Sequence, residues 1–263
     1  MVFDIYNNKP KMFMFVFLVD TSKHVNQMQM DKVNSLFTQI ITELKGAQEN
    51  SKTCELKIAV MEFSQEAKWK TLPTLIQEYE PELFIADENN VNFDNVLKEV
   101  DTAFNRNKFF NYDGKMACPE VFLVTSGKDD GNSKKYVDKL YENGFLHCAN
   151  RHILLTDSNK FELIQTIASN IYSFVNEDKT GIYTTEDSED IIDSFRKFSE
   201  AIRRREEKSK ESCIRPMDYN IPIDHEKWTD TQAVNPFGND PSENSSNGTW
   251  ENSGIPGDIN FWF

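Results

Sequence analysis

A continuous apolar run near the start of the chain restricts its possible folds more than any other feature. Residues 11–20 read KMFMFVFLVD, with apolar side chains at consecutive positions rather than at alternate ones. A strand with this pattern has both faces buried, as in the middle of a parallel sheet that helices cover on each side. Comparable runs recur at 54–64, 120–127 and 151–158. The sequence therefore predicts a sheet with a hydrophobic core on both faces.

Segments with the periodicity of amphipathic helices lie between these runs. These segments are 33–46, 93–104, 133–144, 160–175 and 188–208. Two weaker strand signals complete the pattern: a segment at 67–72 that would form a hairpin with the second run, and an edge strand at 181–187. Strands that alternate with helices predict an α/β fold with a Rossmann-like, doubly wound and mostly parallel sheet.

The hydrophobic periodicity ends near Lys208, which divides the chain into a domain at 1–207 and a tail at 208–263. The tail is rich in Asn, Ser, Gly and Pro, a composition typical of extended or disordered segments. It also carries isolated aromatic residues, namely Trp228, Phe237, Trp250, Phe261, Trp262 and Phe263. Aromatic side chains spaced along a polar segment are typical anchors, so we expect them to bind a partner protein or to dock on the chain's own domain.

Charge and cysteine usage exclude several classes of partner. The formal net charge of −14 is the wrong sign for nucleic acid and for an anionic membrane surface. No apolar run approaches the roughly 20 residues of a membrane-spanning helix. The four cysteines, at 54, 118, 148 and 213, have no CxxC spacing and are typical of reduced thiols in the cytosol. We therefore expect a cytoplasmic protein with no nucleic-acid or membrane partner.

Polar residues follow two of the buried runs at the point where each run ends. The sequence DTSKH at 20–24 follows the first run, and Thr125, Ser126 and Gly127 end the third. In doubly wound sheets, ligands bind outside the carboxyl ends of the strands. If these two strands are neighbours, both loops border one crevice, and this crevice is where we expect the functional site.

Three motifs in this order resemble the von Willebrand factor A (vWA) domain. They are VFLVDTSKH at 16–24, KIAVMEFSQEAKW at 57–69 and PEVFLVTSGKDDGNSKKYVDKL at 119–140. The similarity extends over residues 12–205 and is greatest to the bacterial TerY-type branch, which is associated with tellurite resistance. The resemblance implies a Rossmann-like sheet with one antiparallel edge strand.

The resemblance also implies a metal-ion-dependent adhesion site. In the family this site combines a D-x-S-x-S motif, a Thr before a middle helix and the Asp of a T-D-G motif. Asp20 and Ser22 match the first Asp and Ser of this pattern. His24 replaces the second Ser, Ser126 replaces the Asp of T-D-G, and residues 90–92 offer Asn, Val and Asn in place of the Thr.

A site altered in this way has lost much of its negative charge. Mg²⁺ prefers oxygen ligands in octahedral geometry and depends on carboxylates. We expect Asp20 and Ser22 to be vestigial metal ligands, with weak Mg²⁺ binding at most and no other cofactor. The side chains of Asp87, Asp129 and Asp130 could reach into the site, but none stands at a motif position. In the alternative interpretation, Asp20 and Ser22 are structural groups that cap the following helix.

Two further constellations do not favour catalysis or zinc binding. The segment HCANRH at 147–152 holds two His and one Cys, but a structural zinc site needs four ligands. We expect this segment to be a loop that leads into a strand. Asp20, Ser22 and His24, at a spacing of two residues, cannot easily hydrogen-bond in series as a triad, and no nucleophile elbow is present. The sequence therefore predicts a protein that is not an enzyme.

The functional expectation is a protein-binding or scaffold module. In the branch that the chain resembles, such domains are encoded with a protein kinase and a phosphatase. The resemblance thus implies a cytoplasmic adaptor in a bacterial stress-response or phospho-signalling system. The alternative is a secreted or surface adhesin. Two features favour it: the use of the resembled fold in adhesion, and the glycosylation sequons at Asn244 and Asn247. The sequence shows no export signal that would support this alternative.

Overall fold

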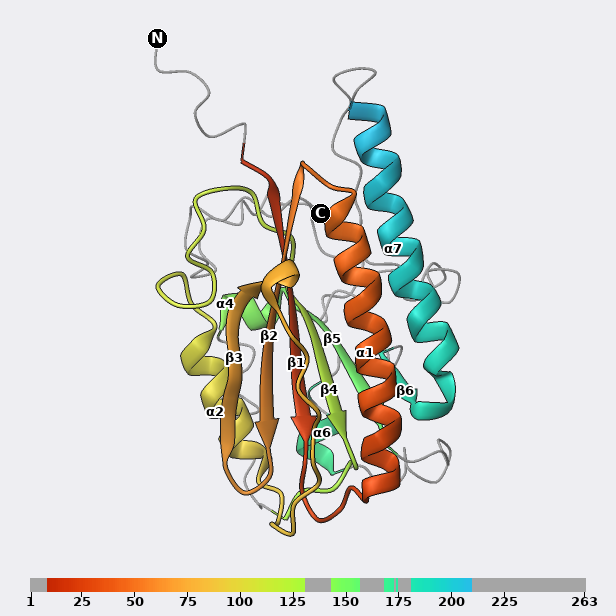
Figure 1. The fold of residues 1–263 in the computed structure, drawn as a ribbon. Helices are drawn as coiled ribbons and strands as arrows, with labels where there is room; N and C mark the ends of the chain where they lie inside the picture. The colour runs from red at the N-terminus through yellow and green to blue at the C-terminus, as the bar shows by residue number, and fades with distance from the viewer. Residues whose placement is uncertain (1–8, 131–142, 157–167, 173, 175–180, 210–263) are drawn as a thin grey trace, which may run out of the picture.

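The computed structural model describes residues 9–130, 143–156, 168–172, 174 and 181–209 (Figure 1). Within these residues the centre is a six-stranded sheet with the order β3-β2-β1-β4-β5-β6. Its strands are β1 (Lys11–Asp20), β2 (Cys54–Phe63), β3 (Ala67–Leu75), β4 (Glu120–Thr125), β5 (Asn150–Leu155) and β6 (Ile182–Thr184). Neighbouring strands are parallel except β2 and β3, which pair antiparallel at one edge. The predicted α/β fold, with a doubly wound, mostly parallel sheet and one antiparallel edge strand, is confirmed.

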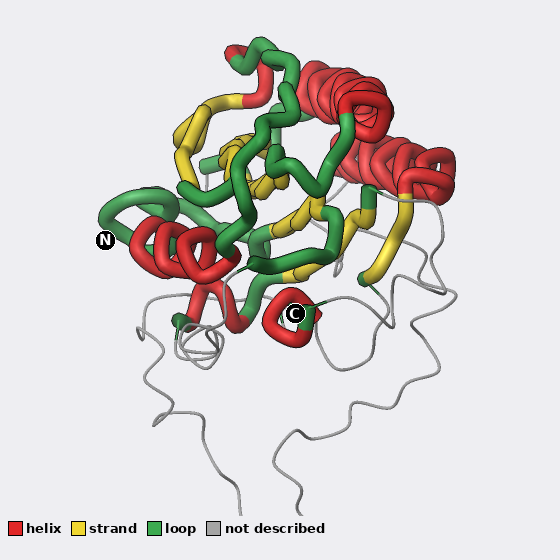
Figure 2. Tube along the Cα trace, turned by 90° about the horizontal axis from the view of Figure 1, so that it is seen from below, coloured by secondary structure: helices red, strands yellow, loops and turns green. Residues whose placement is uncertain are grey.

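Helices cover both faces of the sheet, so it lies in the middle of three layers (Figure 2). The helices are α1 (Gln27–Glu49), α2 (Phe93–Ala103), α4 (Gly144–His147), α6 (Ser169–Tyr172) and α7 (Ser188–Ser209), with short 3₁₀ turns η2 (Ile76–Glu78) and η3 (Thr185–Asp187). Helices α1 and α7 lie side by side on one face, and α2, α4 and α6 pack on the other (Figure 1).

Strand β1 contributes to both cores, as its continuous apolar run predicts. Its even-numbered residues, Met12 to Leu18, pack in the core under α2. Its odd-numbered residues, Phe13 to Val19, pack against α1 and α7. In this second core Phe17 lies edge-on to Phe37 of α1, with ring centroids 5.0 Å apart. Each such side chain contributes about 1.5–3 kcal/mol when it is fully buried, so β1 holds the two layers together.

Helix α1 begins at a cap that the sequence analysis did not identify. Asn26 Oδ1 accepts a hydrogen bond from the Gln29 amide at 3.0 Å, and Gln29 Oε1 accepts one from the Asn26 amide at 2.9 Å. These reciprocal bonds form a capping box. The interpretation that Asp20 and Ser22 cap this helix is therefore wrong, because the N-cap is Asn26, whose side chain accepts from the Gln29 amide.

The ends of several elements differ from the predicted ranges. Helix α1 continues past Gly46 to Glu49, and β3 extends from the predicted 67–72 to Leu75. Strand β3 contains Pro73, which an edge strand tolerates because one side of its backbone has no ladder partner. The expected strand at 181–187 is shorter, and its last three residues form η3 instead.

Parts of the predicted organisation lie outside the described residues. Most of the helices expected at 133–144 and 160–175 fall there, as does the tail from residue 210 with all six of its aromatic residues. The proposed domain boundary at 207 and 208 thus stays a prediction. None of the helices in the described parts of the chain is both long and apolar enough to span a lipid bilayer.

Candidate functional site

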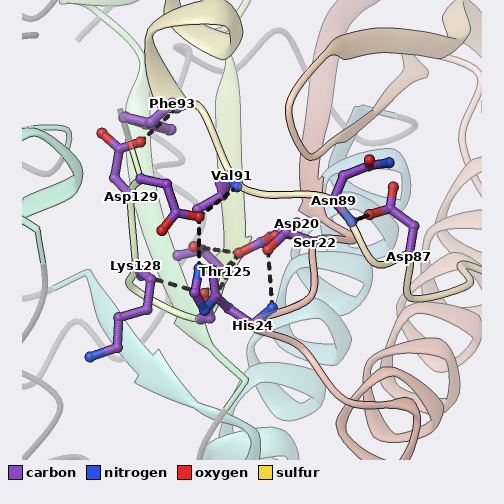
Figure 3. Close-up of polar contacts among 12 residues, drawn as sticks. Asp20, Ser22, His24, Asp87, Asn89, Val91, Phe93, Thr125, Lys128 and Asp129 are labelled. Carbon is purple, nitrogen blue, oxygen red and sulfur yellow. Dashed lines mark hydrogen bonds and ion pairs between the residues drawn. The ribbon is translucent and has the colours of Figure 1, made fainter. Parts of the chain in front are cut away.

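The carboxyl ends of β1 and β4 meet at one edge of the sheet, as the sequence predicts. The two strands are direct neighbours, with Leu18 opposite Leu123 and Val19 opposite Val124. Asp20 is the last residue of β1, and Thr125 is the last residue of β4. Their side chains, with that of Ser22, therefore converge at this edge (Figure 3).

Asp20 is completely buried, and its carboxylate is surrounded by hydrogen-bond donors. Its Oδ1 accepts from the Ser22 amide at 2.9 Å. Its Oδ2 accepts from the Thr125 hydroxyl at 3.1 Å, the Ser126 amide at 3.1 Å and the Ser126 hydroxyl at 3.0 Å. A carboxylate has about four lone-pair sites. Three of the four donors share Oδ2 and one binds Oδ1, so both oxygens of the buried carboxylate accept hydrogen bonds from the chain's own N–H and O–H groups.

Ser126 is central to this arrangement because it donates from both its backbone and its side chain. An Asp at this position, as the family pattern has it, would bring a second negative charge against Asp20. The loop turns sharply after Ser126, where Gly127 has a positive φ of 78°. The amide of Gly127 then donates to the Thr125 hydroxyl at 3.1 Å. Glycine adopts this backbone conformation without strain, so it keeps Ser126 facing Asp20.

A second polar cluster lies beside the first and joins three loops. His24 Nε2 is 2.8 Å from Asp130 Oδ2, and the same oxygen accepts from the Val91 amide at 3.0 Å. The Asp130 amide in turn donates to the Val91 carbonyl at 3.0 Å. The hydrogen bond from Val91 lowers the pKa of Asp130, with further contributions from His24 and Lys23. Asp130 therefore remains ionised while it ties the loops after β1 and β4 to the loop before α2.

Asp129 stabilises the start of α2. Its Oδ1 accepts from the amide of Phe93, the first residue of α2, at 3.1 Å. Asn92, the residue at the N-cap of this helix, makes no capping hydrogen bond with its own side chain. A carboxylate at a helix N-terminus also interacts favourably with the helix dipole. The acids at 129 and 130 thus bind backbone amides around the start of α2, rather than facing Asp20 as a second pair of metal ligands.

The residues at this edge do not fit an octahedral Mg²⁺ site. Asp20 has donors on both oxygens, and the hydroxyl oxygen of buried Ser22 lies 3.4 Å from the His24 amide. Of the three residues predicted for the position of the Thr, Val91 is buried and apolar and Asn90 is exposed. Asn92 has a buried Oδ1 without a hydrogen-bond partner in the described part of the chain, but it would add a neutral oxygen and no second carboxylate. Within the described residues, no three His, Cys, Asp or Glu side chains are grouped to hold a metal ion. The arrangement is a hydrogen-bonded junction between loops.

A polar cleft lies next to the junction, with a volume of about 770 Å³. It opens between the turn of the β2–β3 hairpin and the loop at 87–89, and we call it the hairpin cleft. It is lined by Thr21, Glu62, Phe63, Ser64, Gln65, Glu66, Lys68, Lys70, Asp87, Asn89 and Asn95. The loop at 87–89 is tied to the junction, because the Lys23 amide donates to the Asn89 carbonyl at 2.9 Å and the Asp87 amide donates to the Thr21 carbonyl at 2.6 Å.

The two lysines of the hairpin cleft pair with acids of its rim, and Lys70 also pairs with Glu82 outside the lining. Lys68 lies 2.7 Å from Glu66, and Lys70 lies 3.4 Å from Glu62 and 3.5 Å from Glu82. The hydrogen bond to Glu66 raises the pKa of Lys68, and the charge of Glu62 raises the pKa of Lys70. Exposed pairs of this kind are weak and exchange partners easily. The sequence did not predict this cleft, although residues 62–70 carry two Glu followed by two Lys on either side of the hairpin turn.

The other candidate constellations are not assembled in the structure. His147 is exposed at the end of α4, whereas His152 is buried in β5, with Nε2 3.0 Å from Glu120 Oε2. Of the possible triad, His24 directs its ring to Asp130. Asp20 binds Ser22 only through the Ser22 amide, so no series of hydrogen bonds links the three side chains.

Comparison with known proteins gives structural neighbours only. No protein-family model matches the chain, and no curated protein matches it. Three crystal structures of proximal thread matrix protein 1 from the mussel byssus are similar, with 13–14% identity and TM-scores of 0.42–0.43. One of them is described as having a zinc-occupied MIDAS motif. The similarity covers 72–74% of this chain, which spans about half the length of these neighbours (46–48%).

Proposed function

We propose that this chain is a non-enzymatic protein-binding module of the vWA type, and that it binds its partner at the carboxyl edge of the sheet without a metal ion. The observation that carries this proposal is the buried carboxylate of Asp20, which its own loops supply with donors on both oxygens. A carboxylate that is already satisfied gains little from a cation and would lose these hydrogen bonds in binding one.

The hairpin cleft supplies a surface for a polar segment of a partner protein. Both signs of charge are present at its rim, on Glu66, Lys68 and Lys70. Their side chains can exchange the weak internal pairs for pairs with a partner, which gives specificity through charge complementarity.

The loop junction supports binding because it holds the edge in one conformation before the partner arrives. The bonds from His24 to Asp130 and from Val91 to Asp130 connect loops that are far apart in sequence. Association is weakened when loops must become ordered in the complex. A junction that orders them beforehand removes part of that cost.

The finer role rests on the sequence resemblance. We propose a cytoplasmic adaptor in a stress-response or phospho-signalling system of the tellurite-resistance type, with a protein kinase or phosphatase as a partner. The aromatic residues of the tail at 208–263 would recruit a second protein. What supports this part is the order of the three vWA-like motifs and the spacing of the tail aromatics.

Site-specific photo-crosslinking tests the proposed surface. A photoreactive residue at Asn89, on the rim of the hairpin cleft, is compared with one at exposed Lys32 on α1. We expect a discrete crosslinked partner from Asn89 and none of the same mass from Lys32. Equal crosslinking at both positions would place the interface elsewhere.

The affinity of the purified partner then tests the role of charge and metal. The variant Lys68→Glu/Lys70→Glu should bind about tenfold or more weakly, a loss of about 1.4 kcal/mol. The control Lys32→Glu/Lys98→Glu changes the net charge equally, at exposed positions that do not line the cleft. Binding should be unchanged by EDTA, and a complex that dissociates in EDTA would contradict metal-independent recognition.

A further inference from the structure

An extended segment that belongs to no sheet runs beside α1, at residues 79–87 (Figure 1). These residues form neither a helix nor a strand, and we call them the 79–87 segment. Phe84 is buried in its middle, between Leu83 and Ile85, which are exposed. Side chains that alternate between a buried and an exposed side are typical of extended backbone.

A side-chain amide of α1 takes the place of a neighbouring strand on one side of this segment. Asn34 Nδ2 donates to the Phe84 carbonyl at 2.9 Å, and Asn34 Oδ1 accepts from the Phe84 amide at 2.8 Å. Two paired antiparallel strands exchange both bonds of one residue in the same way. The Phe84 ring also packs against Phe37 of α1, with ring centroids 5.1 Å apart. The segment is therefore held in an extended conformation before any partner binds.

The other side of the 79–87 segment carries backbone groups that could pair with another chain. In extended backbone the N–H and C=O groups of successive residues point to opposite sides, so those of Leu83 and Ile85 point away from Asn34. No hydrogen bond within the described residues reaches these groups, and the two residues are 71% and 70% exposed. We call the backbone groups of Leu83 and Ile85 the free edge. Such an edge is a template for pairing with a second extended chain.

The free edge lies next to the hairpin cleft. Glu82, which precedes it, is 3.5 Å from Lys70 of β3, and Asp87, which follows it, lines the cleft. The 79–87 segment is thus bordered by α1 on the side of Asn34 and by the β2–β3 hairpin on the side of Lys70. A chain that enters the hairpin cleft would therefore meet the free edge.

We propose that the partner binds through an extended segment of its own, which pairs with the free edge as an added strand. This inference rests on the proposed function, because it specifies the kind of segment that the hairpin cleft accepts. A helix cannot take this place, since its backbone groups are already bonded to one another. An extended chain presents donors and acceptors at alternate residues, about 6.6–6.8 Å apart, which is the repeat of Leu83 and Ile85.

The side chains around the free edge indicate the composition of the partner segment. Residues that lie directly opposite each other in paired strands project on the same face. Partner residues opposite Leu83 and Ile85 would contact these two exposed apolar side chains, so they should be β-branched or aromatic. The residue between them would point towards the sheet, where Lys70 lies 3.4 Å from Glu62, so it should be polar. The segment should thus alternate apolar and polar residues.

Hydrogen exchange measured by NMR tests the free edge in the full-length chain itself. We expect the Phe84 amide to be protected, because it is bonded to Asn34, and the amides of Leu83 and Ile85 to exchange as fast as in an unstructured chain. Protection of both of these amides in the free protein would show that the edge is already paired, and would overturn the proposal.

Peptides selected from a random phage library on the full-length chain are the probe for strand pairing. A selected synthetic peptide should bind Leu83→Ser/Ile85→Ser about tenfold or more weakly, because apolar cross-strand pairs are lost. The control Met28→Ser/Leu72→Ser removes two other exposed apolar side chains, at 68% and 61% exposure, and should bind as the native chain does. Bound peptide should protect the Leu83 and Ile85 amides from exchange, and N-methylation of alternate peptide amides should abolish binding.

Three results would contradict strand pairing. They are a library that yields no such peptide, a peptide that binds Leu83→Ser/Ile85→Ser as tightly as the native chain, and a peptide that tolerates N-methylation at every interior position. Dimers that form with rising concentration in light scattering, and that Leu83→Ser/Ile85→Ser abolishes, would identify a second copy of the chain as the occupant and refute the assignment to a partner.

The same variants separate this inference from the proposed function. A peptide that fails to bind Lys68→Glu/Lys70→Glu but binds Leu83→Ser/Ile85→Ser normally would keep the hairpin cleft as the binding surface and refute strand pairing. Alternate protection and N-methylation effects, together with no partner crosslinked from Asn89, would refute the proposed function and leave strand pairing at the free edge in place.

Discussion

Replacing Asp20 with Ala distinguishes a structural carboxylate from a vestigial metal ligand. In the metal-free chain, Asp20 accepts hydrogen bonds from the amides of Ser22 and Ser126 and from the hydroxyls of Thr125 and Ser126. In Asp20→Ala the hydroxyls can rotate towards other acceptors, but the two buried amides cannot. A buried donor without an acceptor costs about 1–3 kcal/mol, so the free energy of unfolding should fall by about 2–6 kcal/mol.

Urea denaturation in EDTA measures this loss. The control is Asp31→Ala, which makes the same truncation at an exposed position on α1, where the carboxylate binds only Gln27 among the contacts of the described residues. Changes at exposed positions are usually within about 0.5 kcal/mol. If Asp20 were held in place for a metal, its removal would relieve an uncompensated buried charge. Unchanged or increased stability of metal-free Asp20→Ala would therefore refute the reasoning.

Three further variants test the polar groups of the sheet edges. Ser126→Asp places a second carboxylate against the first, so it should be less stable than the native chain in EDTA and regain stability in millimolar Mg²⁺, as urea denaturation would show. Burial raises the pKa of Glu120 above 4.5, so the folded chain holds the proton more tightly than the unfolded chain. The stability that this protonated form contributes is lost as the pH rises. Relative to Glu120→Gln, the native chain should therefore become less stable in denaturation experiments from about pH 4.5 upward. In His24→Ala, an NMR titration should find the pKa of Asp130 raised but still below its ordinary value, because the Val91 amide is the larger cause of the shift.

The parts of the fold that the sequence predicted are those set by local patterns. The apolar run of β1 predicted a strand buried on both faces, and the structure confirms this prediction. The hairpin of β2 and β3 was also predicted, because a tight turn separates two strand-like segments. The start of α1 was not predicted, although Asn26 and Gln29 form a local capping box, because polar residues at 20–24 offer competing cap positions just before it.

The contacts of the site were less predictable, since they join residues that only the tertiary fold brings together. The motif predicted that Asp20 and Ser126 lie at one edge of the sheet. It did not predict that the hydroxyl and the amide of Ser126 both donate to Asp20, because these bonds depend on the backbone conformation after β4. His24 and Asp130 are 106 positions apart in the chain, and no local pattern links them. Similarly, the pairing of Glu120 with His152 depends on the register of β4 and β5.

Calorimetric titration of the full-length chain with Mg²⁺ tests the central claim most directly, since the claim is that the carboxyl edge works as a hydrogen-bonded junction without a metal ion. Native protein and Asp20→Ala are titrated in parallel, after EDTA treatment and removal of the chelator. We predict no Mg²⁺ binding tighter than millimolar in either protein, because Asp20 already has donors on both oxygens and no second carboxylate faces it in the described residues. Micromolar binding by the native chain that Asp20→Ala abolishes would contradict the account.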